Sequence, residues 1–149
     1  MVSYDLFCLP HFVIIKNDNN HYMEDSFMLL LIDLTVRLVN GSSHNEGRVE
    51  VFHGGKWGTV CDDDWGIEDA NVVCKMLGYP SALRVSRLME FGEGTGKIIL
   101  DDVNCLGSEK NIAECPHEGF YSNNCFHRED AGVVCDSGIT YSSIHDASY

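Results

Sequence analysis

The chain has 149 residues, the length of about one domain, and its 44% hydrophobic and 22% charged residues are an ordinary globular composition, which excludes wholesale disorder, a collagen and a coiled coil. The 23 acidic residues outnumber the 10 basic ones and give a formal net charge of −13. Nucleic acid, or an anionic membrane held by charge alone, is therefore not an expected partner, because phosphate binding needs clustered Lys and Arg.

Residues 1–35 differ in composition from the rest, and we predict a poorly ordered N-terminal segment. Two short apolar runs, residues 12–15 and 27–32, both fall below the roughly 18 apolar residues that span a bilayer, so we expect no membrane insertion from this segment. The second run has the length of a signal-peptide core, but Glu24 and Asp25 precede it where basic residues are expected. A degenerate signal, a propeptide and a fragment whose start lies upstream all remain open.

Residues 36–135 are predicted to form one domain of short strands and helices, which is an α+β fold. Alternation of charged and apolar residues over 48–51 indicates a half-buried strand, with Arg48 and Glu50 away from the core. Gly54 and Gly55 accept the positive φ angles of a tight hairpin turn and lead into a second strand over 57–61.

The second half of this domain is predicted to contain one main helix, two more strands and a short helix. Apolar residues recur at helical spacing from Glu68, and Gly78 ends that helix. Further strands are expected over 97–103 and 131–135, with a short helix between them over 108–115 whose N-cap is Ser108. The Ser-rich residues 136–149 are predicted to be a flexible tail.

Six of the seven cysteines fall between residues 61 and 135, and no two of them have the C-x-x-C spacing typical of zinc ribbons and redox motifs. This pattern indicates a disulfide framework, and therefore a secreted protein or the ectodomain of a cell-surface protein. Zinc binding is the alternative. Cys8 is left over as an intermolecular partner, a free thiol or a residue absent from the mature protein. The six are Cys61, Cys74, Cys105, Cys115, Cys125 and Cys135.

Several runs in residues 36–135 resemble the scavenger receptor cysteine-rich (SRCR) domain, in the right order from end to end. They are GRVEV at 47–51, WGTVCDDDW at 57–65, ANVVCKMLGY at 70–79, FGEGTG at 91–96 and EDAGVVC at 129–135. The resemblance is to the six-cysteine group A type, and it implies a compact, curved β-sheet that cradles one main helix. It also implies three disulfides, which join Cys61 with Cys125, Cys74 with Cys135 and Cys105 with Cys115.

Acidic residues follow both cysteines of the implied Cys61–Cys125 pair. A disulfide there would tether these carboxylates close together, and such clustering is costly unless a cation such as Ca²⁺ or Mg²⁺ neutralises it. The resemblance implies a divalent-cation site at Asp62, Asp63 and Glu129. The alternatives are a solvated acidic surface, or Asp130 used as a buried hydrogen-bond acceptor.

A second, weaker candidate cation site consists of Asp101, Asp102 and Glu109, which bracket Cys105. Its alternative is that Asp101 and Asp102 alternate across a strand end and point apart. Asp69 is interpreted as a first-turn charge that favours the helix dipole.

Two arginines and one asparagine are the other candidate functional residues. Arg84 and Arg87 fall in the predicted loop after the helix, where they either dock an acidic group of a ligand or are solvated. Asn40 begins an Asn-Gly-Ser glycosylation sequon.

Three further features are given structural rather than functional interpretations. The glycines of residues 92–96 are read as a tight turn, because a phosphate-binding loop would need a different spacing. Trp57 and Trp65 are read as core residues.

No catalytic site is predicted. His53, His117 and His127 have no readable nucleophile or orienting acid beside them, because the cysteines are committed to disulfides and no serine stands in an elbow motif. We therefore expect an extracellular ligand-binding module, not an enzyme.

The expected ligands are polyanions or proteins, including microbial surfaces, in innate recognition or endocytic scavenging, bound through a weak Ca²⁺ or Mg²⁺ site. Avidity from an oligomer or a multi-domain parent is also expected. The alternatives are an accessory module of a mosaic secreted enzyme, such as a protease or an amine oxidase, and a structural adhesion domain without a cation.

Overall fold

The computed structural model describes residues 34–138, together with the backbone of residues 5–9 and 12–16. Contacts divide the chain into two units, residues 1–33 and residues 34–149. In the first unit, strands β1 (Asp5–Leu9) and β2 (Phe12–Lys16) pair antiparallel, with Cys8 opposite Val13. The other residues of the first unit and residues 139–149 lie outside the description, so the predicted order of the segment and of the tail, and the role of Cys8, stay predictions.

The second unit is built on a six-stranded sheet with the order β6-β8-β4-β5-β7, and β3 pairs with β4 outside this path. All pairs are antiparallel except β5 with β7. In chain order the strands are β3 (Thr35–Asn40), β4 (Glu46–His53), β5 (Lys56–Val60), β6 (Ala82–Ser86), β7 (Ile98–Leu100) and β8 (Gly132–Cys135).

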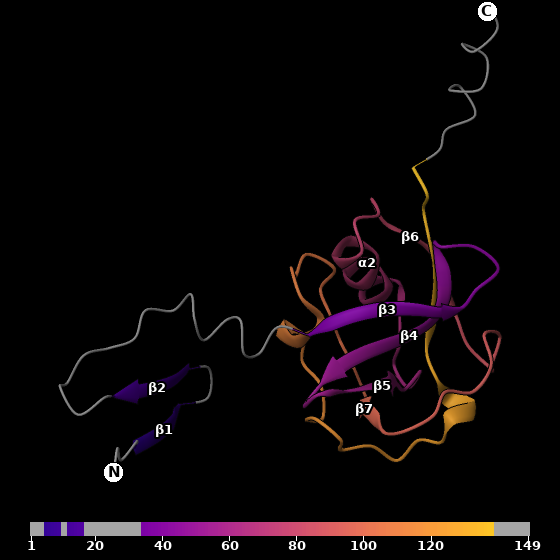
Figure 1. Ribbon diagram of the computed structural model, residues 1–149. Coiled ribbons are helices and arrows are strands. Elements are labelled where there is room, and N and C mark those ends of the chain that lie inside the picture. The colour runs from indigo at the N-terminus through magenta and orange to yellow at the C-terminus, as the bar shows by residue number, and fades with distance from the viewer. Residues whose placement is uncertain (1–4, 10–11, 17–33, 139–149) are drawn as a thin grey trace, which may run out of the picture. The chain divides into compact units, whose positions relative to one another are not determined.

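The main helix, α2 (Ile67–Met76), packs against β6 and β8 (Figure 1). Because β4 pairs with β8 along residues 46–48 and with β5 along residues 50–53, the sheet changes partners and bends along this strand. The predicted α+β class and the curved sheet around one helix are confirmed. Among the described residues, no helix is both long enough and apolar enough to cross a membrane.

The β4–β5 hairpin and α2 form as the sequence predicts. Gly54 and Gly55 have φ angles of 58° and 82°, the positive values that a type I′ turn requires at both central positions. At the start of α2, the Gly66 N–H donates to Asp69 Oδ2 at 2.7 Å. Gly78, with φ 87°, follows the last turn, because a residue without Cβ adopts this left-handed conformation without strain.

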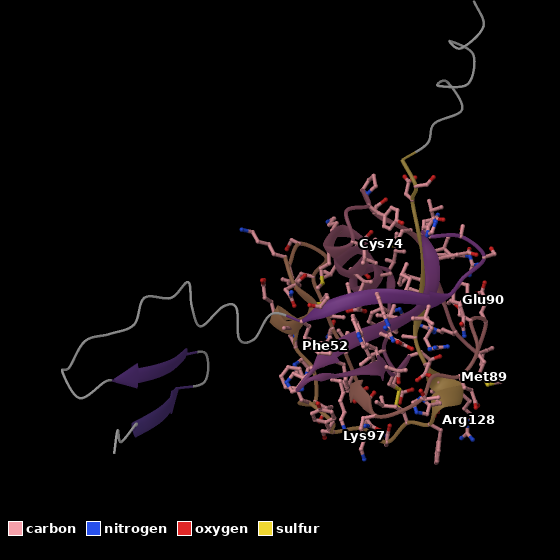
Figure 2. All side chains as sticks on the ribbon, viewed as in Figure 1. Phe52, Cys74, Met89, Glu90, Lys97 and Arg128 are labelled. Carbon is pink, nitrogen blue, oxygen red and sulfur yellow. A yellow bond between two sulfur atoms is a disulfide. The ribbon has the colours of Figure 1, made fainter. Side chains whose placement is uncertain are left out.

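Three disulfides hold the second unit together, and they are the pairs that the resemblance implies: Cys61–Cys125, Cys74–Cys135 and Cys105–Cys115. Cys74 is fully buried on α2 and its partner is the last residue of β8, so this bond joins the helix to the sheet. Figure 2 labels Cys74 at the helix.

The interpretation of β4 as a half-buried strand is wrong, because both of its faces are covered. Val49 and Val51 are fully buried in the core, but Arg48 and Glu50 are also buried and form an ion pair at 2.9 Å. Arg48 Nη1 donates to the carbonyl oxygens of Phe91 and Gly92 at 2.9 and 3.0 Å. A segment that follows β6 therefore covers the face that alternation assigned to solvent.

The predicted helix over residues 108–115 is also wrong. The structure has only a 3₁₀ turn, η1 (Ile112–Glu114), and its N-cap is Asn111 rather than Ser108. The disulfide holds the Cα atoms of Cys105 and Cys115 4.7 Å apart, whereas eight helical residues would extend about 12 Å. Within the loop that this disulfide closes, the chain forms a single 3₁₀ turn instead of the expected helix.

One predicted strand is shorter in the structure, and one predicted loop forms a strand. The strand expected over 97–103 is limited to Ile98–Leu100. Residues 82–86, placed in a loop by the sequence, form strand β6, because they pair antiparallel with β8 at the edge of the sheet.

Candidate cation and ligand site

The Cys61–Cys125 disulfide joins the end of β5 to the segment that leads into the 3₁₀ turn η2 (His127–Glu129). Beside it, the Asp62 N–H donates to the Glu129 carbonyl oxygen at 2.6 Å, and Cys61 forms an isolated bridge with Asp130. The covalent bond and these backbone contacts hold the two acidic segments next to each other.

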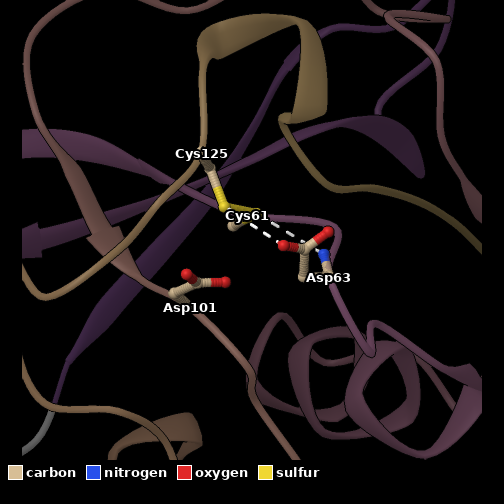
Figure 3. Close-up of side chains that lie close together, drawn as sticks. All are labelled: Cys61, Asp63, Asp101 and Cys125. Carbon is tan, nitrogen blue, oxygen red and sulfur yellow. Dashed lines mark hydrogen bonds between the residues drawn. A yellow bond between two sulfur atoms is a disulfide. The ribbon is translucent and has the colours of Figure 1, made fainter.

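Asp63 and Asp101 point toward the same side of this disulfide (Figure 3). One carboxylate oxygen from each lies within 4.8 Å of the other and of both disulfide sulfurs. The sulfurs are bonded to each other and are not metal ligands, so this group offers two carboxylates. Asp101, at the end of β7, is buried, and the Asp102 N–H donates to its Oδ1 at 2.8 Å.

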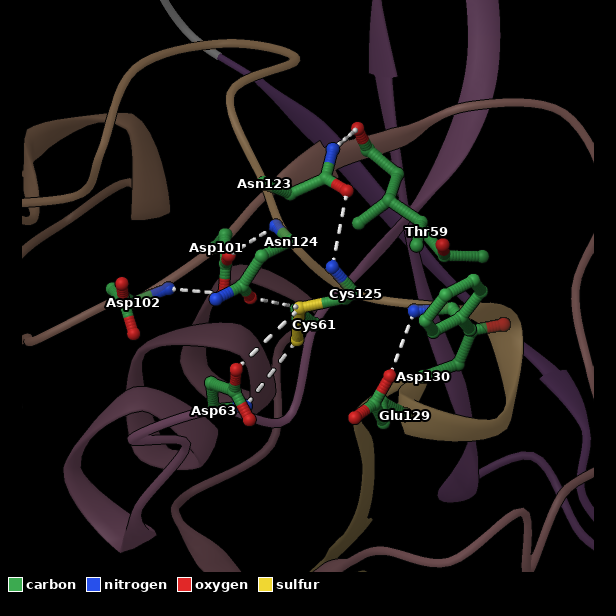
Figure 4. The surroundings of a disulfide bond; sticks show 12 residues. Thr59, Cys61, Asp63, Asp101, Asp102, Asn123, Asn124, Cys125, Glu129 and Asp130 are labelled. Atoms are coloured by element: carbon green, nitrogen blue, oxygen red, sulfur yellow. Dashed lines mark hydrogen bonds between the residues drawn. A yellow bond between two sulfur atoms is a disulfide. The ribbon is translucent and has the colours of Figure 1, made fainter.

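The loop before Cys125 completes the surroundings of Asp101. The Asn124 N–H donates to Asp101 Oδ2 at 3.3 Å, and Asn123 Nδ2 donates to the Ile98 carbonyl oxygen at 3.1 Å (Figure 4). The loop is therefore hydrogen-bonded to β7 on one side and covalently bonded to β5 on the other, which fixes Asp101 beside Asp63.

The carboxylates of this region oppose one another's ionisation. Burial raises the pKa of Asp62, and the charges of Asp63 and Glu129 raise it further. Burial likewise raises the pKa of Asp63, with Asp101 and Glu129 adding to the effect. The charge of Asp101 is the main cause that raises the pKa of Asp102. Asp63 is thus the carboxylate that lies near both Glu129 and Asp101.

The structure only partly assembles the first predicted set. Asp62, Asp63 and Glu129 are electrostatic neighbours, but within residues 34–138 their three carboxylates do not converge within 4.8 Å of one another. One Glu129 oxygen accepts from the Phe126 N–H at 2.7 Å, which closes η2. Hard carboxylate oxygens around a shared space nevertheless fit Ca²⁺ or Mg²⁺.

Within the described residues, the structure does not place the three carboxylates of the second predicted set, Asp101, Asp102 and Glu109, within 4.8 Å of one another. Glu109 accepts from the N–H groups of Leu106 and Gly107 at 2.7 and 2.8 Å, and its carboxylate lies beside the Cys105–Cys115 disulfide. It closes its own loop, whereas Asp101 lies beside Asp63. Sequence reasoning found Asp101 but missed its partner, since Asp63 belongs to a strand end about forty residues earlier.

Asp130 is a buried hydrogen-bond acceptor, as one alternative held. Its Oδ2 accepts from the Gly94 N–H at 2.7 Å and lies 3.1 Å from His127 Nδ1. A Cβ atom on Gly94 would come within 2.4 Å of Thr59 Cγ2 and 2.9 Å of Asp130 Oδ2, so only glycine fits here. The glycine-rich segment thus packs against the sheet.

These features together form a six-cysteine framework with paired acidic segments. A family model for the scavenger receptor cysteine-rich domain matches residues 39–136. The chain belongs to the SRCR family. SRCR domains are extracellular and are generally binding modules without catalytic activity, and they bind protein ligands.

Curated relatives share the domain but are much longer. The SRCR chain is 56% identical over 104 residues to a scavenger receptor cysteine-rich domain superfamily protein of Patiria pectinifera, covering 70% of this chain and 9% of that protein. It is 49% identical over 116 residues to galectin-3-binding protein of Mus musculus, and the match covers 78% of this chain and 20% of that protein. The chain thus spans a fifth or less of the length of these two relatives.

Solved SRCR structures agree with the fold. The third SRCR domain of murine neurotrypsin is 49% identical, with a TM-score of 0.65, and the match covers 69% of this chain and 96% of that one. The SRCR domain of mouse MARCO, in its dimeric form, is 44% identical, with a TM-score of 0.58, and the match covers 68% and 94%.

The two candidate ligand-binding arginines of the SRCR domain do not form a joint basic patch. Arg84 lies in β6, not in a loop, and its guanidinium binds both oxygens of Glu90 at 2.8 and 2.6 Å. This ion pair lowers the pKa of Glu90 to about 2, with help from Ser86. Arg87 Nη2 donates to the Trp65 carbonyl oxygen, and its charge lies near Asp62.

Of the two tryptophans, only Trp65 is a core residue. It is fully buried, and its Nε1 donates to the Gly132 carbonyl oxygen at 3.3 Å. Trp57 is half-buried on the outer face, where the Arg37 guanidinium lies 4.1 Å from its ring centre. Alternation along β5 explains the difference from the prediction, since Trp57 points away from the core.

The glycosylation prediction at Asn40 remains a prediction. The Asn40 side chain is exposed at the end of β3, has a φ angle of 65°, and donates from Nδ2 to the Phe91 carbonyl oxygen at 3.3 Å.

Two histidines of the SRCR domain pack on one aromatic ring. His53 stacks on Phe120 with ring centres 4.0 Å apart, and His117 lies 5.1 Å from the same ring. His117 Nδ1 accepts from the Gly119 N–H at 2.9 Å, a bond that requires the neutral ring. Burial lowers the pKa of His117.

Acid should therefore destabilise the domain through His117. Because its pKa in the folded state is lower than in the unfolded state, its contribution is complete above about pH 6.5 and is lost as the pH falls below that value. We expect His117→Asn, which keeps an acceptor, to reduce the loss of unfolding free energy between about pH 7.5 and about pH 5. Urea denaturation at both pH values measures this, with exposed His44→Asn as control. An unchanged pH dependence in His117→Asn would contradict the assignment.

Proposed function

We propose that residues 34–138 form an extracellular module that recognises ligands through a weakly bound divalent cation. Asp63 is the common member of the proposed site, with Asp62 and Glu129 on one side and Asp101 on the other. The observation that carries the proposal is that carboxylate oxygens of Asp63 and Asp101 lie within 4.8 Å of each other beside the Cys61–Cys125 disulfide, where their negative charges repel. A cation removes this repulsion.

A cation at this position explains how an acidic domain binds anions. Carboxylate ligands from a domain surface leave part of the coordination shell of Ca²⁺ open, and a sulfate, phosphate or carboxylate group of the ligand completes the shell. Extracellular sites of this kind bind calcium at about 10⁻⁴ to 10⁻³ M. The biological roles that fit are innate recognition of microbial surfaces and endocytic scavenging.

A single module is expected to bind its ligand weakly, so the proposal includes several modules in one larger assembly. The relatives are five or more times longer than the matched region, which fits a module within a multi-domain parent. The same observation supports the second candidate, an accessory binding module of a mosaic secreted enzyme. Both candidates share the cation site.

The proposal predicts that binding depends on a divalent cation. Wild-type protein should bind a dextran sulfate surface in buffer with calcium, lose that binding in chelator, and regain it when calcium or magnesium is restored. Surface plasmon resonance measures the three states on one surface. Binding that persists in chelator contradicts the cation mechanism, and no binding in any state favours a structural adhesion domain.

A further inference from the structure

Strand β3 has a partner on one edge only. It pairs antiparallel with β4 from Thr35 to Asn40, and within residues 34–138 no other strand pairs with it. In an antiparallel pair, every second residue of an edge strand directs its N–H and C=O groups away from the partner. β3 therefore offers a row of backbone donors and acceptors to a further strand, and such an edge tends to pair with other chains unless something covers it.

An open groove of about 610 Å³ lies beside β3, and its lining is partly apolar. Leu38 of β3 lines it together with Leu77 and Tyr79, which follow α2. These three side chains are half-buried and pack against the hydrophobic core. A strand added to β3 would thus gain apolar contacts as well as backbone hydrogen bonds. We call this space the β3 groove and define it by Val36, Leu38, Asn40, His44, Leu77 and Tyr79.

The chain leaves β8 next to the β3 groove. The Cys135 N–H donates to the Asn45 carbonyl oxygen at 2.7 Å, and Asn45 Nδ2 donates to the Cys135 carbonyl oxygen at 2.7 Å. Further along, a Cβ atom on Gly138 would lie 3.7 Å from Pro80 Cγ. Asn45 and Pro80 each follow a groove residue directly in the sequence. Residues 139–149 therefore begin beside the groove.

The sequence of residues 139–149, the C-terminal segment, alternates as a half-buried strand does. Apolar side chains at 139, 141, 147 and 149 alternate with polar ones at 140, 142, 146 and 148, and Ile144 is the exception on the polar side. Isoleucine, threonine and tyrosine are also residues that strands favour. Serine content predicts a flexible tail here, but two of the three serines fall on the polar side of this pattern.

The C-terminal segment is long enough to follow the whole of β3. At about 3.3 Å per residue, its eleven residues extend about 36 Å, whereas the six residues of β3 extend about 20 Å. Asn45 belongs to the turn after β3, so the segment starts at the Asn40 end of that strand. From there it can run along β3 only toward Thr35, which is the antiparallel direction.

We propose that residues 139–149 add to the free edge of β3 as a further antiparallel strand, with Ile139 and Tyr141 packing in the β3 groove. The C-terminal segment then covers backbone groups that would otherwise be open to the edge strand of a second copy. This inference goes beyond the proposed function, because neither the groove nor the segment contains a carboxylate of the cation site.

Hydrogen exchange of the full chain, followed by mass spectrometry, tests the added strand. In the wild type, the amides of residues 140–143 should exchange at least about tenfold more slowly than those of a synthetic peptide of residues 138–149. The Ile139→Ser, Tyr141→Ser double variant should lose this protection, and the amides of β3 that face away from β4 should then exchange faster too. Ile144→Ser, on the polar side of the pattern, is the matched control and should behave as wild type.

A photoreactive group at position 141 tests where the segment lies. With benzoylphenylalanine in place of Tyr141, illumination should cross-link the C-terminal segment to residues 36–44 or 77–79, which peptide mapping identifies. Cross-links confined to other residues, or amides of 140–143 that exchange as fast in the wild type as in the peptide, overturn the proposal. A wild-type dimer by light scattering, with β3 protected while the segment exchanges freely, also overturns it and assigns the edge to a second copy.

Discussion

Replacing Cys61 and Cys125 together by alanine should lower the free energy of unfolding by about 4 kcal/mol. The bond closes a loop of 64 residues, and in the chain-entropy model a loop of this length restricts the unfolded chain strongly. The same bond holds the acidic turn after β5 against η2, so the variant should also lose calcium affinity. Urea denaturation and calcium titration measure the two effects.

The Cys105 and Cys115 pair supplies the matched control. Its loop spans 10 residues, so replacing both cysteines should cost only about 2.7 kcal/mol. The bond lies beside Glu109 rather than Asp63, and calcium affinity should therefore be retained. Equal affinities in the two variants would show that the Cys61–Cys125 bond does not organise the site.

The sequence predicted the elements that are determined by a few neighbouring residues, namely the hairpin turn and the end of the main helix. The Gly54-Gly55 turn and the helix ending before Gly78 follow from backbone conformations that glycine alone adopts easily. The two faces of β4 could not be assigned in this way. Alternation separates Arg48 from Val49, but it carries no information about the later segment around Phe91 that covers Arg48.

The sequence predicted which acidic residues belong to the candidate site, but not which of them lie next to each other. The position of Asp62 and Asp63 next to Cys61, together with Glu129 after Cys125, was enough to predict one acidic cluster. Pairing of Asp63 with Asp101 depends on the parallel contact between β5 and β7, which join segments far apart in the chain. Non-local pairing of this kind leaves no periodic signal in the sequence.

Asp63→Asn should have the largest effect on cation binding of any single carboxylate replacement. Asp63 lies near both Asp101 and Glu129, and the asparagine side chain keeps the size of the aspartate side chain while removing its charge. Asp64→Asn is the matched control, because Asp64 is the exposed next residue and its φ angle of 56° is one that asparagine tolerates.

Titration of the wild-type protein and these two variants with calcium by isothermal calorimetry tests the cation site most directly. We expect wild type and Asp64→Asn to bind one ion with a dissociation constant of about 10⁻⁴ to 10⁻³ M, and Asp63→Asn to give no binding heat. No heat from the wild-type protein, or an unchanged affinity in Asp63→Asn, would contradict a divalent cation held at this surface.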